Sequence, residues 1–495
     1  MNESSTNLSD EFDAVASRAR ERVAVGEGGR TWSYRDLLSR SQEITATLAG
    51  LCGGPGQRVG LMLPNSAAFV ASFFGIARAG GVVCPLNVRY RSQELGYYLR
   101  DTGAVALLLA ADAVERSTAA LSELPDPPAL VVVEAGGGHR VVRARRGTPD
   151  PRPSRGSPPL LHQYTSGSTG APKRVVRTHA NLLDELARLA RVFSLSEADR
   201  FLGAAPFSHV NGLVRTMLAS MYVGATLYPV GEFRRREVLD LIRHEQLTFF
   251  GGVPYMYAIL AGTPKRDDVD LASLRIAFSA SAPLLPADNR RFHDAYGIFV
   301  RQLYGSTETG TISVNLHPDA ERHLQSVGPP LDGVELEILD DERRPLPRGQ
   351  EGEVAIRTSA AITAYEGNRE ATASSFHHGF YLSGDLGRQD EAGYVTLTGR
   401  KKFLINRGGY KVNPLEVEEA IASHPKVREV VVAGLPGPHG DEIVRCVIVP
   451  ESACTEGEIL AHCKSRIADF KIPGRIEFRQ ALPRSETGKI LRHEL

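Results

Sequence analysis

The residues with the clearest capacity for chemistry form one run at positions 164–173, with the sequence Tyr-Thr-Ser-Gly-Ser-Thr-Gly-Ala-Pro-Lys. Glycine allows positive φ and close backbone approach, hydroxyl groups donate hydrogen bonds to phosphate oxygens, and the lysine ammonium balances phosphate charge. The run is not a Walker A loop, because Lys173 is followed by Arg174 and not by serine or threonine. We interpret it as a polyphosphate-binding loop of another design, and an ordinary polar loop is the alternative.

A second polar segment, residues 302–309, is predicted to follow a strand. Tyr304 offers an aromatic face to a base, Thr307 offers a hydroxyl to the α-phosphate, and Glu308 is the kind of oxygen ligand that Mg²⁺ takes beside phosphates. Taken alone, the segment is also compatible with a strand-end turn and a solvated glutamate. The segment therefore supports a nucleotide-binding site only in combination with the phosphate-binding run.

Three further segments carry polar groups suited to a nucleotide. In residues 381–387, Asp385 is predicted to lie in a turn between glycines, where its two oxygens can accept hydrogen bonds from ribose hydroxyls. The others are residues 399–410, with Arg400 and Lys402, and residues 483–492, with Lys489. A plain turn at Asp385 and solvated lysines near the C-terminus are the alternatives for these segments in isolation.

These five segments, in this order and at these separations, resemble the adenylate-forming superfamily of acyl-CoA synthetases, carrier-loading adenylation domains and beetle luciferases. Residues 206–212, 279–283 and 352–357 are further landmarks of the same kind. The resemblance spans nearly the whole chain and is closest to acyl-CoA synthetases and to CoA ligases of aryl and short-chain acids. It implies an enzyme, an acid–thiol ligase that uses ATP, Mg²⁺ and CoA.

The resemblance also implies roles for individual residues. Thr307 and Glu308 serve phosphate and Mg²⁺, Asp385 and Arg400 bind ribose, and Lys489 bridges the carboxylate and the α-phosphate. Lys402 falls at a hinge between a large and a small domain. The remaining nucleotide and CoA residues that the resemblance implies are the phosphate loop Thr165, Ser166, Gly167, Ser168, Thr169, Gly170 and Lys173, the adenine site Tyr304, Gly305, Ala282 and Pro283, and the pantetheine-passing pair Gly408 and Gly409.

The implied reaction has two halves. A carboxylate attacks the α-phosphate of Mg·ATP, which gives an acyl-adenylate and pyrophosphate while Lys489 neutralises the developing charge. A thiol must then attack where Lys489 had been, so the small domain is expected to rotate about Lys402. The resemblance thus predicts one site used in two conformations.

The acid is expected to bind near residues 209–212. His209 resembles the histidine that borders the carboxylate and gates the acyl pocket, and a core histidine bonded to backbone is the alternative. The other predicted pocket residues are Val210, Asn211, Gly212, Tyr255, Ala280 and Ser281. Because Ala280 stands where the family commonly has glycine and Tyr255 is bulky, we expect a small or planar acid, such as an aryl or short-chain carboxylate.

Arg174 is a second departure from the family, which usually has glycine directly after the phosphate-loop lysine. The departure puts the mobility of the loop in doubt and leaves its ligand unchanged. Its consequence is not evident from the sequence.

The elements that must position these residues follow an α/β order. Apolar runs alternate with helical patterns from residue 58 to residue 109 and again after the phosphate loop, which predicts one large α/β body. Residues 134–159, rich in Gly, Arg, Pro and Ser, are predicted to form a surface loop. We expect a large N-terminal domain at 1–400, with a β subdomain at about 325–398, and a small mobile α+β domain at 401–495.

Composition narrows the class of protein further. Lysine plus arginine and aspartate plus glutamate both total 58 of the 495 residues, so no net charge attracts nucleic acid or an anionic membrane. Five scattered cysteines without CxxC spacing argue against disulfides or zinc. Without a signal peptide or about 20 consecutive apolar residues, the chain is expected to be soluble, cytoplasmic and not membrane-inserted, as a monomer or homodimer.

Several functions stay open at this point. The leading interpretation is a CoA ligase, and the alternatives are a freestanding enzyme that loads an acyl carrier protein and a tailoring enzyme that transfers the activated group, activated nitrite included, to an amine. A non-catalytic ligand-binding relative is disfavoured because Lys173, Glu308, Asp385 and Lys489 are all present. The identity of the acid, the acceptor and the oligomeric state are not decided by the sequence.

Overall fold

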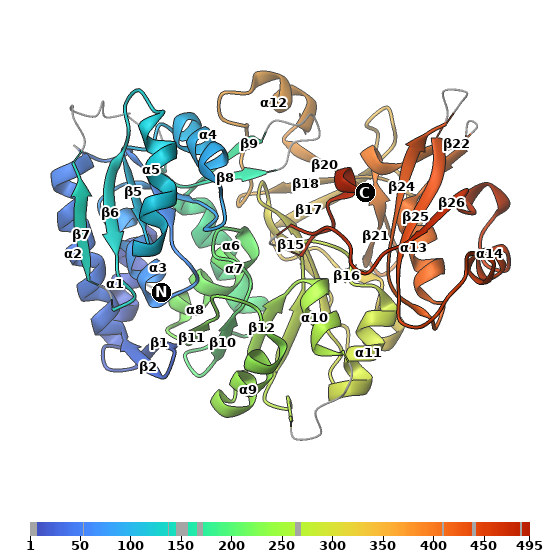
Figure 1. Cartoon of the computed structure of the whole chain (residues 1–495), viewed down its shortest axis with the longest axis horizontal. Helices are drawn as coiled ribbons and strands as arrows, with labels where there is room; N and C mark the ends of the chain where they lie inside the picture. Colours follow the sequence, from blue (N-terminus) through green and yellow to red (C-terminus); the bar gives the residue numbers. More distant parts are fainter. Residues whose placement is uncertain are drawn as a thin grey trace.

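The computed structural model describes residues 7–52, 54–136, 138–144, 157–165, 172–262, 269–407, 410–437, 442–485 and 488–495. Two large sheets build the N-terminal half, a smaller β-sheet follows, and a compact α+β unit ends the chain (Figure 1). The α/β class with a small C-terminal domain, predicted from the sequence, is confirmed.

The first large sheet has seven strands in the order β7-β6-β5-β3-β4-β8-β9, parallel at its centre and antiparallel at both edges. Its central strands are buried apolar runs, as expected for parallel strands covered on both faces. The strands are β3 (Arg58–Met62), β4 (Val82–Pro85), β5 (Ala106–Leu109), β6 (Ala129–Val133), β7 (His139–Arg143), β8 (Pro159–Thr165) and β9 (Lys173–Thr178).

The second large sheet has eight strands in the order β15-β14-β13-β12-β10-β11-β1-β2, again parallel from β14 to β1. Several candidate site residues, such as His209, Ala280 and Glu308, follow strands of this sheet. The strands are β1 (Val23–Glu27), β2 (Arg30–Ser33), β10 (Arg200–Gly203), β11 (Thr226–Pro229), β12 (Phe249–Gly252), β13 (Ile276–Ser279), β14 (Arg301–Ser306) and β15 (Gly310–Val314).

Helices cover both large sheets. Helix α3 (Ala67–Arg78) is almost entirely apolar and buried, begins at a Ser66 side chain that accepts from the Phe69 amide, and packs on α2 (Tyr34–Cys52). The remaining helices of this half are α1 (Leu8–Arg18), α4 (Ser92–Thr102), α5 (Val114–Ser122), α6 (His179–Val192), α7 (Val210–Gly212), α8 (Ala219–Val223), α9 (Arg235–Glu245), α10 (Pro254–Leu260) and α11 (Pro286–Tyr296), with a π-helical turn at Leu213–Leu218 between α7 and α8.

A smaller, antiparallel sheet follows, with strand order β16-β21-β20-β18-β17 and β19 paired to β20. Helix α12 (Arg369–Ser375) lies beside it. The strands are β16 (Ser326–Gly328), β17 (Val334–Leu339), β18 (Gly352–Thr358), β19 (Phe376–His377), β20 (Phe380–Gln389) and β21 (Val395–Arg400).

The C-terminal unit has its own apolar core, formed mainly by valine, isoleucine and cysteine side chains. A hairpin of β22 (Ile405–Arg407) and β23 (Tyr410–Val412) precedes a three-stranded sheet in the order β24-β25-β26, which α13 and α14 cover. These elements are α13 (Pro414–Ala422), β24 (Val427–Pro436), β25 (Glu442–Pro450), α14 (Glu456–Lys464) and β26 (Arg475–Phe478). Figure 1 shows this unit beside the smaller sheet, with the end of the chain returning toward β20.

The structure corrects two sequence-based expectations. The stretch 134–159, predicted as a loop, contains the edge strand β7. Asp385 lies inside strand β20 and not in a turn. Strand β7 is an arginine-containing edge, whose pattern lacks the apolar run of a central strand.

Two global features complete the description. In the part of the chain that the structure describes, we find no helix with the length and apolar character required to span a bilayer. All five cysteines lie within the described residues, and none of them is in a disulfide there.

Candidate active site

The phosphate-binding run is held at the open end of the β8–β9 hairpin. Thr165 and Lys173 are paired across the ladder, so the two ends of the run lie side by side. The predicted loop residues between them, Ser166, Gly167, Ser168, Thr169 and Gly170, lie outside the described residues. Strand pairing therefore fixes where the run leaves the sheet and where it returns.

The hairpin brings Lys173 and Thr165 to Glu308, a residue more than 130 positions away in the sequence. The hydroxyl of Thr165 donates to Oε1 of Glu308 at 3.2 Å, and the hydroxyl of Tyr365 donates to the same oxygen at 2.9 Å. The ammonium nitrogen of Lys173 lies 4.6 Å from the centroid of the Tyr365 ring. Tyr365, which the sequence reasoning missed, thus connects the phosphate-loop lysine with the acidic residue.

Glu308 fits the role of a magnesium ligand. Its Oε1 accepts two hydrogen bonds, while its Oε2 accepts none from the described residues. Among these residues no group of three or more His, Cys, Asp or Glu side chains could hold a metal. A single carboxylate beside a polyphosphate is the usual arrangement for Mg²⁺, which keeps several waters and binds phosphate oxygens directly.

A buried ion network supports the hairpin that carries Thr307 and Glu308. Glu185 of α6 pairs with Nη1 of Arg177 at 2.7 Å and with Nε of Arg215 at 3.7 Å, and it accepts from Thr311 at 2.6 Å. A Cβ at Gly305 would lie 2.3 Å from Nη2 of Arg215, so only glycine fits there. Although burial raises the pKa of Glu185, the two guanidinium groups outweigh it and hold this pKa below its ordinary value.

The structure gives Arg174 specific partners. Its Nη2 contacts Oδ1 of Asp101 on α4 at 2.8 Å, and the hydroxyl of Tyr164 donates to Oδ2 of the same carboxylate at 2.5 Å. The carbonyl of Arg174 accepts from the Glu366 amide at 3.2 Å. Arg174 and Tyr164 face each other across the β8–β9 ladder, so one carboxylate joins both strands directly before the loop.

The residues predicted to bind the nucleoside also meet. Tyr304 on β14 donates its hydroxyl to Oδ2 of Asp385 at 2.8 Å, and Nε of Arg400 contacts Oδ1 of Asp385 at 2.5 Å. Asp385 and Arg400 are neighbours in the β20–β21 ladder. The turn of Ala282 and Pro283 lies beside β14, because the following residue, Leu284, donates its amide to the side chain of Gln302 at 3.0 Å.

Three cations, Arg400, Lys402 and Lys489, interact with this carboxylate, and a fourth, Lys173, interacts with Lys402. Burial lowers the pKa of Lys402, and Arg400 and Lys173 lower it further. Burial also lowers the pKa of Lys489 to about 8, again with help from Arg400 and Lys402, although much of this residue is exposed to solvent. Asp385 opposes both shifts. Like charges assembled from three segments of the chain are suited to a polyanion.

A turn of the C-terminal segment presents Lys489. The Ser485 amide donates to the Lys489 carbonyl at 2.8 Å, and Nη1 of Arg484 donates to the Gly488 carbonyl at 2.7 Å. The guanidinium carbon of Arg484 lies 4.6 Å from the centroid of the Tyr255 ring. Tyr255, predicted as a wall of the acid pocket, thus contacts the C-terminal segment, and Arg484 is a positioning residue that sequence reasoning missed.

The predicted acid-binding residues form a third group. Asn211 donates its Nδ2 to the Gly252 carbonyl at 3.1 Å, and the Ala280 amide donates to the same oxygen at 3.1 Å. Asn211 and Ala280 are therefore neighbours. Gly212 is required by close packing, since a Cβ there would lie 2.3 Å from the Ala205 carbonyl oxygen.

His209 lies at the start of this segment and Ser281 beyond β13. Burial lowers the pKa of His209 to about 4, so its ring is neutral at pH 7. Within the described residues the ring donates and accepts no hydrogen bond, unlike a core histidine bonded to backbone. Ser281 has a φ of 74°, and Val210 is half-buried at the first turn of α7.

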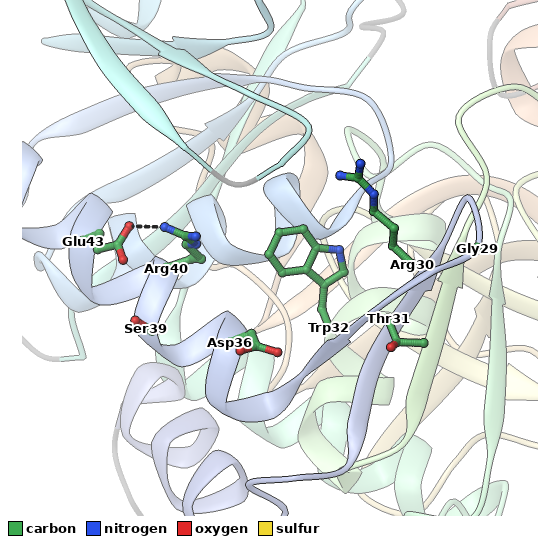
Figure 2. Close-up of a pocket in the computed structure, with 8 residues that line it drawn as sticks. All are labelled: Gly29, Arg30, Thr31, Trp32, Asp36, Ser39, Arg40 and Glu43. Atoms are coloured by element: carbon green, nitrogen blue, oxygen red, sulfur yellow. Dashed lines mark hydrogen bonds and ion pairs between the residues drawn. The ribbon is translucent and has the colours of Figure 1, made fainter.

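The predicted pair Gly408 and Gly409 falls outside the described residues. One pocket lies apart from this site. A cavity of about 600 Å³ between β2 and α2 contains none of the predicted site residues. Figure 2 shows its lining around the ring of Trp32, with Arg40 paired to Glu43.

Comparison with known proteins identifies the family. The AMP-binding enzyme pattern matches residues 12–365, and the AMP-binding enzyme C-terminal domain matches residues 416–489. The chain belongs to this family, the adenylate-forming superfamily, as its motifs predicted. More particularly, it is an AMP-forming acyl-CoA synthetase, an enzyme that activates an acid and ligates it to CoA.

Three similar proteins illustrate the range of acids in the family. Oxalate–CoA ligase of Arabidopsis thaliana is 31% identical over 99% of this chain and 98% of its own length. Long-chain-fatty-acid–CoA ligase FadD13 of Mycobacterium tuberculosis is 31% identical over 93% of this chain and 92% of its own. The anthranilate CoA ligase AuaEII, solved with anthranoyl-AMP, superposes with a TM-score of 0.87 and 27% identity, covering 99% of this chain and 96% of that one.

Proposed function

We propose that this acyl-CoA synthetase activates a small or planar carboxylic acid with Mg·ATP and transfers it to the thiol of CoA. The observation that carries the proposal is the grouping of Arg400, Lys402 and Lys489 around Asp385, with Lys173 interacting with Lys402 and lying over Tyr365, which bonds to Glu308. A polyphosphate supplies the negative charge that this cluster lacks. The ribose hydroxyls can donate to the Asp385 carboxylate.

In the first half-reaction, a carboxylate oxygen of the acid attacks the α-phosphorus of ATP, and the bond to the β-phosphate breaks to release pyrophosphate. Lys489 neutralises the charge that develops between the two reacting groups, and Thr307 contacts the α-phosphate. Glu308 would hold Mg²⁺, which neutralises the charge of the phosphates when bound. The neutral ring of His209 borders the acid without repelling its anion.

In the second half-reaction, the CoA sulfur attacks the carbonyl carbon of the acyl-adenylate and AMP leaves. Lys489 occupies the approach to this carbon, so the small domain must move. We place the hinge at Lys402, in the short 3₁₀ turn Lys401–Phe403, between domains at 1–400 and 401–495, and assign the passage of pantetheine to Gly408 and Gly409.

The contacts that hold the small domain in its present position suit such a movement. They are mainly polar and partly exposed, such as Arg484 on Tyr255 and the bond between Gln325 and Glu419 at 3.2 Å. Polar interfaces of this kind permit relative domain motion.

The acid is inferred from the pocket, because relatives of equal identity take short and long acids. The Ala280 amide and the Asn211 carboxamide bond to the same Gly252 carbonyl oxygen, and both residues are almost completely buried. A methyl group in place of the glycine that the family commonly has narrows the space at this point, and a buried amide is less suited to an apolar chain than an apolar side chain would be. This supports a small or planar acid.

One experiment tests the proposal. The purified protein is incubated with ATP, Mg²⁺ and single acids, including aryl acids, short-chain acids, a C16 acid and nitrite, and pyrophosphate release is measured. CoA, a carrier protein or an amine is then added and the products are identified by mass. Pyrophosphate release with small acids and a CoA thioester are expected. Release without CoA acylation would assign the acceptor to a carrier protein or an amine, and no release with any acid would refute the proposal.

A further inference from the structure

The helical segment after His209 places a polar side chain where the acid is proposed to bind. Asn211 is 2% exposed, and its Nδ2 donates to the Gly252 carbonyl at 3.1 Å. This bond fixes the orientation of the carboxamide. Its Oδ1 is buried and has no hydrogen-bond partner among the described residues. Such an oxygen costs about 1–3 kcal/mol when it remains unbonded, so a missing partner is indicated.

Two nearby side-chain oxygens, on Gln163 and Ser279, are also buried without a hydrogen-bond partner among the described residues. Gln163 donates its Nε2 to the Ser208 carbonyl at 3.1 Å, and its Oε1 is buried without a partner in the described part of the chain. Ser279 pairs with Gly252 across β12 and β13, and its Oγ is likewise buried without one. Three such oxygens, from β8, α7 and β13, are therefore found in the segment 208–212 or on residues next to it.

The chemistry of these atoms defines the missing group. A carboxamide oxygen only accepts hydrogen bonds, so Asn211 and Gln163 both require a donor. An aliphatic or unsubstituted aryl chain supplies none. A second carboxylate on the acid would place an acceptor against an acceptor.

We propose that the acid carries a hydroxyl or amino group, and that this group donates a hydrogen bond to Oδ1 of Asn211. The inference rests on the proposed function and names the class of acid within it. Asn211 is then a specificity-determining residue. The reacting carboxylate lies toward Lys489, and the substituent lies toward Asn211, Ala280 and Gly252.

Matched acids test this assignment through pyrophosphate release. The pairs are salicylate or anthranilate against benzoate, and 3-hydroxypropionate or β-alanine against propionate. In the wild type, kcat/KM is expected to favour the substituted member of at least one pair by about 5- to 150-fold, the equivalent of about 1–3 kcal/mol. Asn211→Leu, which keeps the side-chain volume and removes the acceptor, is expected to reduce this ratio to about 2 or less.

Asn289→Leu is the matched control. The Asn289 carboxamide is also buried, but both of its ends are bonded to Val300, at 2.8 Å and 2.9 Å. Its loss is expected to reduce stability and leave the acid preference at the wild-type ratio. If Asn211→Leu does not bind ATP, Asn211→Ala is measured in its place.

Each outcome decides the inference. Pyrophosphate release without preference within any pair, or a preference that survives in the Asn211 variant, overturns the assignment and leaves the proposed function intact. A preference for benzoate or propionate also overturns it. Absence of pyrophosphate release with every acid refutes the proposed function and this inference together.

Discussion

Replacing Arg174 by alanine is predicted to weaken ATP binding, because this side chain ties the phosphate-loop hairpin to helix α4. Its contact with Oδ1 of Asp101 is 2.8 Å long, and the two side chains are 31% and 21% exposed. Fully exposed ion pairs contribute about 0–1 kcal/mol, whereas breaking a buried pair costs about 3–5 kcal/mol. At this intermediate burial we expect about 1–2 kcal/mol, since Asp101 keeps its bond to Tyr164.

This energy is expected to appear mainly in the affinity for ATP. Arg174 is the residue after Lys173, whose ammonium group belongs to the cation cluster. Arg174→Ala should therefore raise the KM for Mg·ATP by about 5- to 30-fold, the equivalent of about 1–2 kcal/mol at a factor of ten per 1.4 kcal/mol. The kcat at saturating ATP should change much less, because the reacting groups are still in place. Pyrophosphate release at varied ATP measures both quantities.

A double-mutant cycle with Asp101→Asn isolates the contact. We expect a coupling of about 1–2 kcal/mol between the two changes, whereas independent sites add within about 0.3–0.5 kcal/mol. Arg140→Ala, on the exposed edge strand β7, is the control for loss of a positive charge. An unchanged KM for ATP, or additivity of the two substitutions, would refute the view that Arg174 restrains the loop.

Three further predictions concern the charged groups. Lys489→Ala should slow adenylation by about 10²- to 10³-fold, because about 3–4 kcal/mol of charge stabilisation is lost. The variant should still acylate CoA from a presynthesised acyl-adenylate, and equal losses in both half-reactions would contradict the prediction. Lys464→Ala, on α14, is the control. Only protonated Lys489 neutralises charge, and its pKa is lowered to about 8, so the kcat/KM of adenylation should fall as the pH rises through about 8. Lys489→Arg should move this fall to higher pH. If the fall stays at the same pH in this variant, Lys489 is not its source. Glu308→Gln should raise the Mg²⁺ concentration needed for half-maximal activity by about 10- to 100-fold. Tyr365→Phe, which removes one hydrogen bond to Glu308, should raise this concentration by less. If neither substitution changes it, Mg²⁺ binds elsewhere.

Much of the fold was predictable because its central strands are parallel and buried on both faces. Strands β3, β4 and β5 alternate with helices α3 and α4 over the residues 58–109 for which the sequence predicted this order. Strand β7 was missed because its sequence does not alternate apolar with polar residues. Its two valines, Val141 and Val142, are adjacent, and both are exposed on this edge. Asp385 was assigned to a turn because glycines flank it, whereas the ladder partner Arg400 keeps it in a strand.

The site was predictable only where one segment carries the chemistry. Lys173, Glu308 and Lys489 stand in recognisable motifs. Asp101 and Tyr365 do not, since each acts by contacting a motif residue from a distant element. Arg484 precedes Lys489 by five positions, but its contact with Tyr255 depends on how the C-terminal unit docks. Such residues have no local signature, because their role arises from packing.

The cation cluster also predicts an order for the two proposed half-reactions. Lys489 is the only one of the four cations that the C-terminal turn supplies, and burial, followed by Arg400 and Lys402, lowers its pKa. We expect the ATP phosphates to offset the repulsion among these cations, so ATP should favour the arrangement in which Lys489 is inserted. Pyrophosphate release should withdraw most of the compensating charge. The repulsion should then favour departure of Lys489, which would open the carbonyl carbon to the thiol.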